Sequence, residues 1–152
     1  MNMSQARHPK RQQVKVFISH SEADLVFARN VRKLLVQRVN AQVFTTEDLS
    51  AGEKWEPKVR SKLSSTDVVV ALLTPHSVGS SWVLLEIGAA WALEKPIMPV
   101  VTRRDVLNQM PASLEGSSHI LELADVETGK NEDKFIDAFE AFKETLAAAH
   151  LA

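Results

Sequence analysis

Apolar and polar residues are distributed along the chain in two patterns. Short runs rich in β-branched and aromatic residues predict strands, and longer segments in which apolar residues recur every three or four positions predict helices. The expected strands are residues 14–19, 41–45, 68–74, 97–101 and 119–123. The expected helices are residues 21–39, 56–64, 80–94 and 131–149, and the segments 46–57, 75–81 and 103–117 are expected to be largely irregular.

The order of these elements predicts an α/β fold, because strands alternate with helices. The run at residues 68–74 is apolar without interruption, as in strands that are covered on both faces. We expect a flavodoxin-like three-layer sandwich, with a five-stranded parallel sheet in the order 2-1-3-4-5 and helices on both faces. Ligands bind such sheets outside the carboxyl ends of the strands where the order reverses. The loops expected there are Ser19-His20-Ser21 and residues 75–81.

The helix that begins at Ser80 or Ser81 carries an unusual acid. It is apolar nearly all round, which predicts burial, and Trp91 is expected in the core. Glu86 interrupts it one turn beyond Trp82, on the same face of the helix. An ionisable group among apolar neighbours needs a partner, a solvent-filled cleft or a chemical role. Glu86 is therefore the first candidate for a functional residue.

Composition narrows the class of protein further. The chain has 152 residues, 45% of them hydrophobic, and a net charge of −1, which gives no reason to expect nucleic-acid binding. It has no cysteine, and no apolar run approaches the roughly 18 residues of a membrane helix. Residues 1–13 are expected to form a disordered basic tail, and residues 14–150 a single domain in the cytoplasm.

Several site chemistries do not fit the expected fold. A phosphoryl-accepting receiver domain needs acids at the ends of strands 1 and 3, where Ser19, His20 and Thr74 stand. The glycine fingerprint of dinucleotide-binding folds and the phosphate-binding loop are both missing. The histidines show no metal-ligand spacing, so no metal site is expected. They are His8, His20, His76, His119 and His150.

Three motifs, in order along the chain, carry a resemblance to a known family. Val16-Phe17-Ile18-Ser19-His20-Ser21 resembles the first box of Toll/interleukin-1 receptor (TIR) domains, and residues 49–55 resemble the BB loop after their second strand. Residues 81–86 resemble the Trp-x-x-x-Glu element of the catalytic members. Residues 87–101 are similar to the bacterial branch, and the resemblance covers residues 14–149.

This resemblance implies an NAD+ glycohydrolase (an NAD+ nucleosidase) that cleaves the nicotinamide–ribose bond, with a linear or a cyclised ADP-ribose as product. NAD+ would be the substrate and no cofactor is implied. One carboxylate, Glu86, suits this reaction, because nicotinamide is already cationic and leaves without a general acid, while the ribose becomes oxocarbenium-like. The residues implied to bind the substrate are Ser19, His20, Ser21, Thr45, Ser81 and Trp82.

The family also implies self-assembly. The BB loop of one copy would contact a neighbouring TIR domain, and the assembly residues implied here are Asp48, Leu49, Gly52 and Trp55. The expected partners are other TIR domains, in a homo-oligomer or filament formed on activation, and a sensor that is separate or fused. The resemblance implies a role in bacterial immune, anti-phage signalling.

Two alternatives remain open from the residues. A non-catalytic TIR adaptor would act only through TIR–TIR contacts, and such adaptors can keep an acid at the position of Glu86. A nucleoside deoxyribosyltransferase shares the α/β plan and a carboxylate at the anomeric carbon, although the resemblance of residues 49–55 to the BB loop argues against it.

Overall fold

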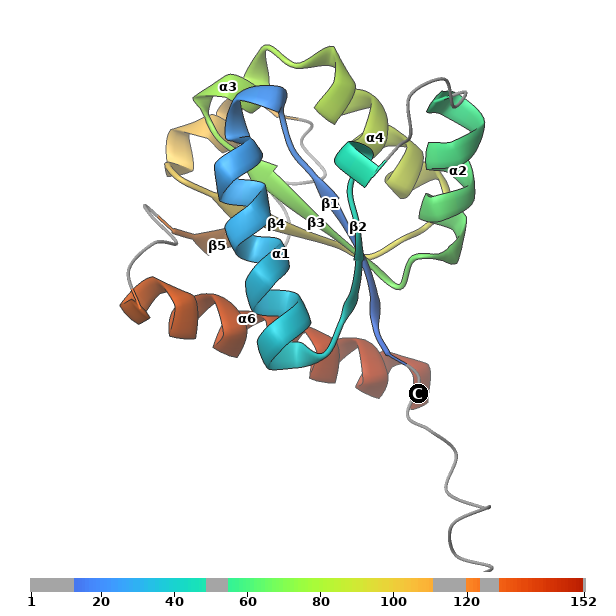
Figure 1. The fold of residues 1–152 in the computed structure, drawn as a ribbon, viewed down its shortest axis with the longest axis vertical. Helices are drawn as coiled ribbons and strands as arrows, with labels where there is room; N and C mark the ends of the chain where they lie inside the picture. Colours follow the sequence, from blue (N-terminus) through green and yellow to red (C-terminus); the bar gives the residue numbers. More distant parts are fainter. Residues whose placement is uncertain (1–12, 49–54, 111–119, 124–128, 152) are drawn as a thin grey trace, which may run out of the picture.

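The computed structural model describes residues 13–48, 55–110, 120–123 and 129–151, with the side chains of the last helix described over 131–148. Its centre is a five-stranded sheet (Figure 1). The strands are β1 (Lys15–Ser19), β2 (Gln42–Phe44), β3 (Val68–Leu73), β4 (Ile97–Val101) and β5 (Leu121–Glu122). All neighbouring strands are parallel, and the order β2-β1-β3-β4-β5 confirms the predicted topology.

Helices connect the strands, close to the predicted positions. They are α1 (Leu25–Val39), preceded by the 3-10 turn η1 (Glu22–Asp24), then α2 (Trp55–Ser65), α3 (Pro75–Val78), α4 (Ser81–Ala92) and α6 (Gly129–Leu151), with further 3-10 turns η2 (Thr46–Asp48) and η3 (Arg104–Gln109). The segment 75–81, expected to be a loop, contains the single turn α3. The Thr74 Oγ1 caps that turn by accepting a hydrogen bond from the His76 N–H, and the Ser77 Oγ accepts one from the Thr74 N–H.

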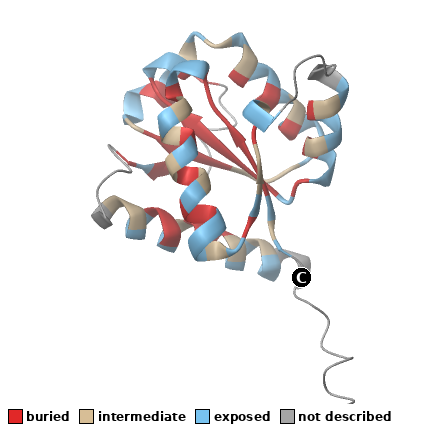
Figure 2. Ribbon diagram, viewed as in Figure 1, coloured by how far each residue is buried: buried red, intermediate tan, exposed pale blue. Residues whose placement is uncertain are grey.

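The helices cover the sheet in two layers, as Figure 1 shows. Alternate residues of β3 face opposite sides of the sheet. Val68, Val70 and Leu72 pack with α1 and α6, whereas Val69, Ala71 and Leu73 pack with α2, α4 and η3. Every residue of β3 is buried, as its uninterrupted apolar run predicts. In Figure 2 the central strands accordingly stand out as the most continuously buried part of the molecule.

Helix α4 differs from its prediction. Only one stripe of it packs on the sheet, through Val83, Ile87 and Ala90. The expectation that the whole helix is buried is wrong, and so is the placement of Trp91 in the core, because Trp91 is 67% exposed. We call the opposite stripe the α4 outer face, and it consists of the exposed residues Leu84, Leu85, Gly88, Trp91 and Ala92. A large apolar surface of this kind often marks an interaction site.

The described residues begin with Gln13, two positions before β1. Residues 1–12 of the expected basic tail lie outside the described residues, and Gln13 donates a side-chain hydrogen bond to the Asn40 carbonyl at the end of α1. None of the helices in the described part of the chain is both long enough and apolar enough to span a membrane.

Candidate functional site

The site predicted at the reversal of strand order is built from the end of β1 and the second turn of α4. Ser19 is the last residue of β1 and is fully buried. Helix α4 begins at Ser81 because Ser80 caps it, its Oγ accepting the Val83 N–H at 3.3 Å. Ser81, which the resemblance assigned to substrate binding, is exposed on the first turn of α4.

Glu86 lies at the centre of this site. The Ser19 Oγ donates a hydrogen bond of 2.9 Å to Oε1 of Glu86, which joins two residues 67 positions apart in the sequence. Glu86 is 1% exposed, and its Oε2 has no hydrogen-bond partner among the described residues. An unsatisfied buried polar atom costs about 1–3 kcal/mol, so a fold keeps one only where something offsets that cost. The orphaned oxygen therefore points to a ligand-binding role.

The same burial changes the ionisation of Glu86. Burial raises the pKa of Glu86 from its ordinary 4.5 to about 8, and the hydrogen bond from Ser19 opposes that rise only in part. In the free protein at neutral pH the group therefore mostly keeps its proton. A cation placed beside it would stabilise the charged form and lower its pKa again.

His20 supplies a second orphaned atom. It is 5% exposed, and its Nδ1 lies 2.8 Å from the carbonyl oxygen of Ser21. A carbonyl only accepts, so the proton of the neutral imidazole must be on Nδ1, which leaves Nε2 as an acceptor. Nε2 is buried and has no partner within the described residues. The end of β1 thus presents an acceptor nitrogen next in sequence to the serine that holds Glu86.

Asp24 ties the two loops of the site together. Its Oδ2 accepts hydrogen bonds of 2.6 Å from the Ser21 Oγ and of 2.6 Å from the Thr74 Oγ1, so the loop after β1 is joined to the loop after β3. The spacing Ser21-x-x-Asp24 is typical of a helix start, but the Ser21 side chain makes no capping bond. Nothing in the sequence spacing pairs Asp24 with Thr74, which lies 50 residues away.

A pocket of about 370 Å³ reaches Glu86 between α2 and α4. It is lined by Val59, Arg60, Leu63, Leu85, Glu86, Ala89, Ala92 and Leu93, so its walls are apolar apart from one acid and one arginine. Because Glu86 is almost fully buried, its carboxyl oxygens lie behind the pocket wall. A ligand reaches them only after a neighbouring side chain shifts. Arg60 is a residue that the sequence patterns did not single out.

The remaining predicted residues lie in the turn after β2, on α4, or outside the described residues. Thr45 is buried and its Oγ1 accepts the Glu47 N–H, a bond that shapes the turn after β2. Asp48 forms an ion pair of 2.7 Å with Arg32 and also accepts the Thr45 N–H. Trp82 is half-buried on the first turn of α4. Leu49 and Gly52 lie outside the described residues, as does the side chain of Trp55, the first residue of α2.

Within the described ranges, no group of three or more histidine, aspartate or glutamate side chains is arranged to hold a metal ion. Side-chain hydrogen bonds bring the polar residues of the site together in two groups, Ser19 with Glu86 and Asp24 with Ser21 and Thr74.

Fold and site together define a doubly wound α/β domain with a buried carboxyl group at the switch point of its sheet. The sequence model of the family described as TIR domain matches residues 16–141. The chain therefore belongs to the TIR domain family. A comparison with curated protein sequences gives no match.

Solved structures agree on the fold. The TIR domain of the Toll-related receptor TRR-2 from Hydra magnipapillata superposes with a TM-score of 0.62 at 16% identity, over 81% of this chain and 96% of that one. The TIR domains of the activated Roq1 resistosome, which recognises the effector XopQ, give 0.63 at 15% identity, over 84% and 99%. The CMP N-glycosidase BcmB of Clostridium botulinum gives 0.53 at 15% identity, over 81% and 98%. At these identities the likeness shows the fold alone.

The ionisation of Glu86 makes stability depend on pH. Between about pH 5 and pH 8 the unfolded chain has released this proton while the folded protein still holds it, so wild-type stability should fall as the pH rises. Glu86→Gln does not titrate. It should match the wild type near pH 5 and exceed it by about 3 kcal/mol near pH 8 in the free energy of unfolding from denaturant titrations.

The matched control for that comparison is Glu144→Gln, a change at an exposed glutamate of α6. Its stability should follow the wild type at every pH. Parallel curves for Glu86→Gln and the wild type between pH 5 and pH 8 would show that the Glu86 carboxyl is not perturbed in the way its burial requires.

Proposed function

We propose that this TIR domain is an NAD+ glycohydrolase and that Glu86 is its catalytic carboxylate. The observation that carries the proposal is the Glu86 side chain, whose Oε1 is held by Ser19 and whose Oε2 lies behind the wall of an apolar pocket with no hydrogen-bond partner among the described residues. A buried acid with a strongly raised pKa, located in a pocket, is the kind of group that active sites contain.

The reaction needs few groups from the protein. The bond between the ribose C1′ and the nicotinamide nitrogen breaks, and its electron pair neutralises the positively charged ring, which leaves as neutral nicotinamide. The ribose left behind carries oxocarbenium character, and the Glu86 carboxylate stabilises that charge across a short, poorly screened distance. Water then adds to C1′ and gives its proton to Glu86, which yields ADP-ribose. A nucleophile within the ADP-ribose itself would give a cyclic product by the same route.

The raised pKa of Glu86 fits this substrate. In the free protein the carboxyl is mostly neutral, which limits the cost of burying it. A bound nicotinamide ring brings a fixed positive charge into the same pocket and lowers the pKa of Glu86, so the ionised form is favoured when the scissile bond is in place. The site would thus bind a cation better than a neutral nucleoside.

Other residues at the end of β1 support the carboxylate in this proposal. The Ser19 hydroxyl fixes the orientation of Glu86. The His20 Nε2 is a buried acceptor that a ribose hydroxyl or the nicotinamide amide could satisfy. Ser81 and Trp82, on the first turn of α4, also belong to the proposed substrate-binding set, as do Ser21 and Thr45. The N-glycosidase among the structural neighbours indicates that this fold is compatible with cleaving an N-glycosidic bond.

The decisive test measures nicotinamide released from NAD+ by the purified chain at high protein concentration. The wild type should release nicotinamide, and Glu86→Gln should lose about 10²- to 10⁴-fold in rate because the charge that stabilises the transition state is gone. Glu144→Gln, on the opposite side of the sheet, should keep full activity. Equal rates for Glu86→Gln and wild type would remove Glu86 from the mechanism.

The α4 outer face favours a second role, assembly with other TIR domains. Five neighbouring positions there carry no charge, and Leu85 and Trp91 are 52% and 67% exposed. Leu85 and Ala92 belong both to this face and to the pocket that contains Glu86, so a second copy docked on α4 would also cover the pocket mouth. Self-association without any release of nicotinamide from NAD+ would favour the adaptor alternative.

Trp91 tests this surface directly. Trp91→Glu should fold normally, because the side chain is exposed, and should abolish any rise of apparent mass with concentration in sedimentation or light scattering. Val26→Glu, at a position of α1 that is 62% exposed, is the matched control and should associate like the wild type. Unchanged association of Trp91→Glu would mean that copies meet through another surface.

A further inference from the structure

Arg60 differs from the other arginines of the described chain. Six arginines lie in the described ranges, and five of them have a carboxylate partner. The pairs are Arg29–Glu47, Arg32–Asp48, Arg38–Asp133, Arg103–Asp105 and Arg104–Glu122. Arg60 forms no ion pair and no side-chain hydrogen bond with any described residue. None of its five N–H donors is therefore used by a described residue.

The position of Arg60 gives that guanidinium a context. Arg60 lies on the second turn of α2, exposed, and lines the pocket whose opposite wall contains Glu86. The other side chains that line the pocket are aliphatic, among them Val59, Leu63 and Leu85. An apolar groove screens charge less than open water does, so a ligand bound there would interact electrostatically with both Arg60 and Glu86. The pocket thus has a permanent cation, Arg60, on one wall and the buried carboxyl of Glu86 behind the other.

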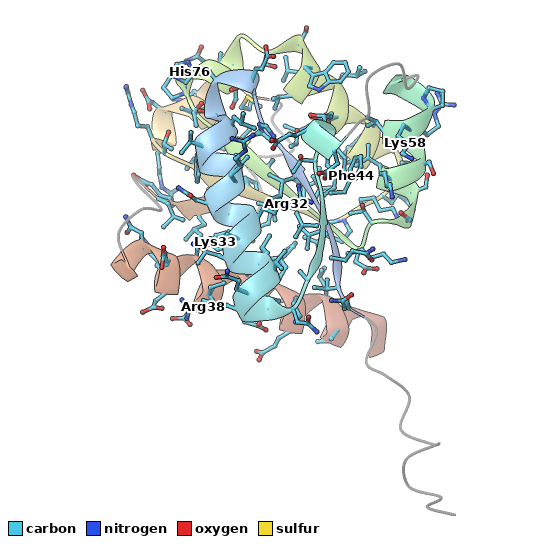
Figure 3. The ribbon with its side chains drawn as sticks, in the orientation of Figure 1. Arg32, Lys33, Arg38, Phe44, Lys58 and His76 are labelled. Carbon is cyan, nitrogen blue, oxygen red and sulfur yellow. The ribbon has the colours of Figure 1, made fainter. Side chains whose placement is uncertain are left out.

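Other basic residues do not share this position. Figure 3 shows Arg32, Lys33 and Arg38 along α1, which packs on the face of the sheet opposite to α2 and α4. On α2 itself, the Lys62 ammonium lies 5.2 Å from the centre of the Phe44 ring, on the side of β2. Of the basic residues in the described part of the chain, Arg60 is the one that lines the pocket with Glu86.

A ligand that satisfies both charges must carry a cation next to the scissile bond and an anion farther along. A nicotinamide dinucleotide has this order, with a cationic ring on one ribose and a diphosphate beyond it. We propose that Arg60 binds the diphosphate of the dinucleotide and so selects phosphorylated substrates over the free nucleoside. This inference rests on the proposed NAD+ cleavage. A guanidinium suits the task because its planar fork donates two parallel hydrogen bonds to phosphate oxygens.

Binding at the diphosphate predicts a particular kinetic effect. The diphosphate takes no part in bond breaking, so its contact with Arg60 is the same in the ground state and the transition state. Losing it should raise KM and leave kcat nearly unchanged. A charge-assisted hydrogen bond contributes about 1.5–3 kcal/mol, which corresponds to a rise of about tenfold or more in KM.

The experiment compares two substrates that share the scissile bond. NAD+ carries the diphosphate, and nicotinamide riboside has no phosphate. Arg60→Gln should raise KM for NAD+ about tenfold, change kcat less than about twofold, and leave both constants for nicotinamide riboside unaltered. Arg60→Lys should recover only part of the affinity, because an ammonium cannot form the bidentate contact. Arg38→Gln, on the opposite face of the sheet, should behave as the wild type.

A binding measurement separates this inference from the proposed reaction. Calorimetry with ADP-ribose, which has the diphosphate and no nicotinamide, should show binding to the wild type that weakens about tenfold in Arg60→Gln and not in Arg38→Gln. If NAD+ is cleaved but neither KM nor ADP-ribose affinity responds to Arg60→Gln, the assignment of Arg60 is wrong and the enzyme assignment stands. If ADP-ribose binds through Arg60 but nicotinamide is never released, the reaction is wrong and the diphosphate site stands. Absence of ADP-ribose binding to the wild type overturns the site.

Discussion

The chemistry proposed for this domain depends on the burial of a single carboxyl group, that of Glu86. Glu86 sits on a helix that packs against the sheet, so its charge is removed from water, and one hydrogen bond from Ser19 compensates only in part. Because the compensation is incomplete, burial raises the pKa of Glu86. Its Oε2 has no hydrogen-bond partner among the described residues. In the proposed function a positively charged ligand is favoured, because a nearby cation stabilises the ionised form of Glu86.

The fold supplies the framework that makes this arrangement rigid. Parallel strands β1 and β3 end at the same edge of the sheet, and Asp24 joins the loops that follow them through the hydroxyls of Ser21 and Thr74. The chain then passes through α3 and enters α4, whose first residue is set by the Ser80 cap. Glu86 therefore lies on the second turn of α4, where it meets Ser19. Residues far apart in sequence thus meet through backbone geometry that the sheet dictates.

The sequence predicts some of these features better than others. Strand order follows from alternating patterns, and Glu86 stands out because an acid in an apolar helix is rare. The exposure of Trp91 could not be predicted, since a helix that is apolar all round does not reveal which stripe packs. Arg60 resembles any solvated arginine of a polar helix, and its significance comes only from a pocket formed with a second helix. The sequence around Asp24 indicates only a helix start, and its hydrogen bond with Thr74 could not be predicted because the two residues are 50 positions apart.

The most direct test compares the ionisation of Glu86 with catalysis. A carbon-13 NMR titration of the Glu86 carboxyl in the free protein, assigned with Glu86→Gln, should give a pKa near 8 instead of the ordinary 4.5. The kcat/KM for NAD+ should rise with pH through the same midpoint, because that ratio reports ionisation in the free enzyme. A carboxyl that titrates near 4.5, or a kcat/KM that does not change across the midpoint of the Glu86 titration, would contradict the role assigned to Glu86.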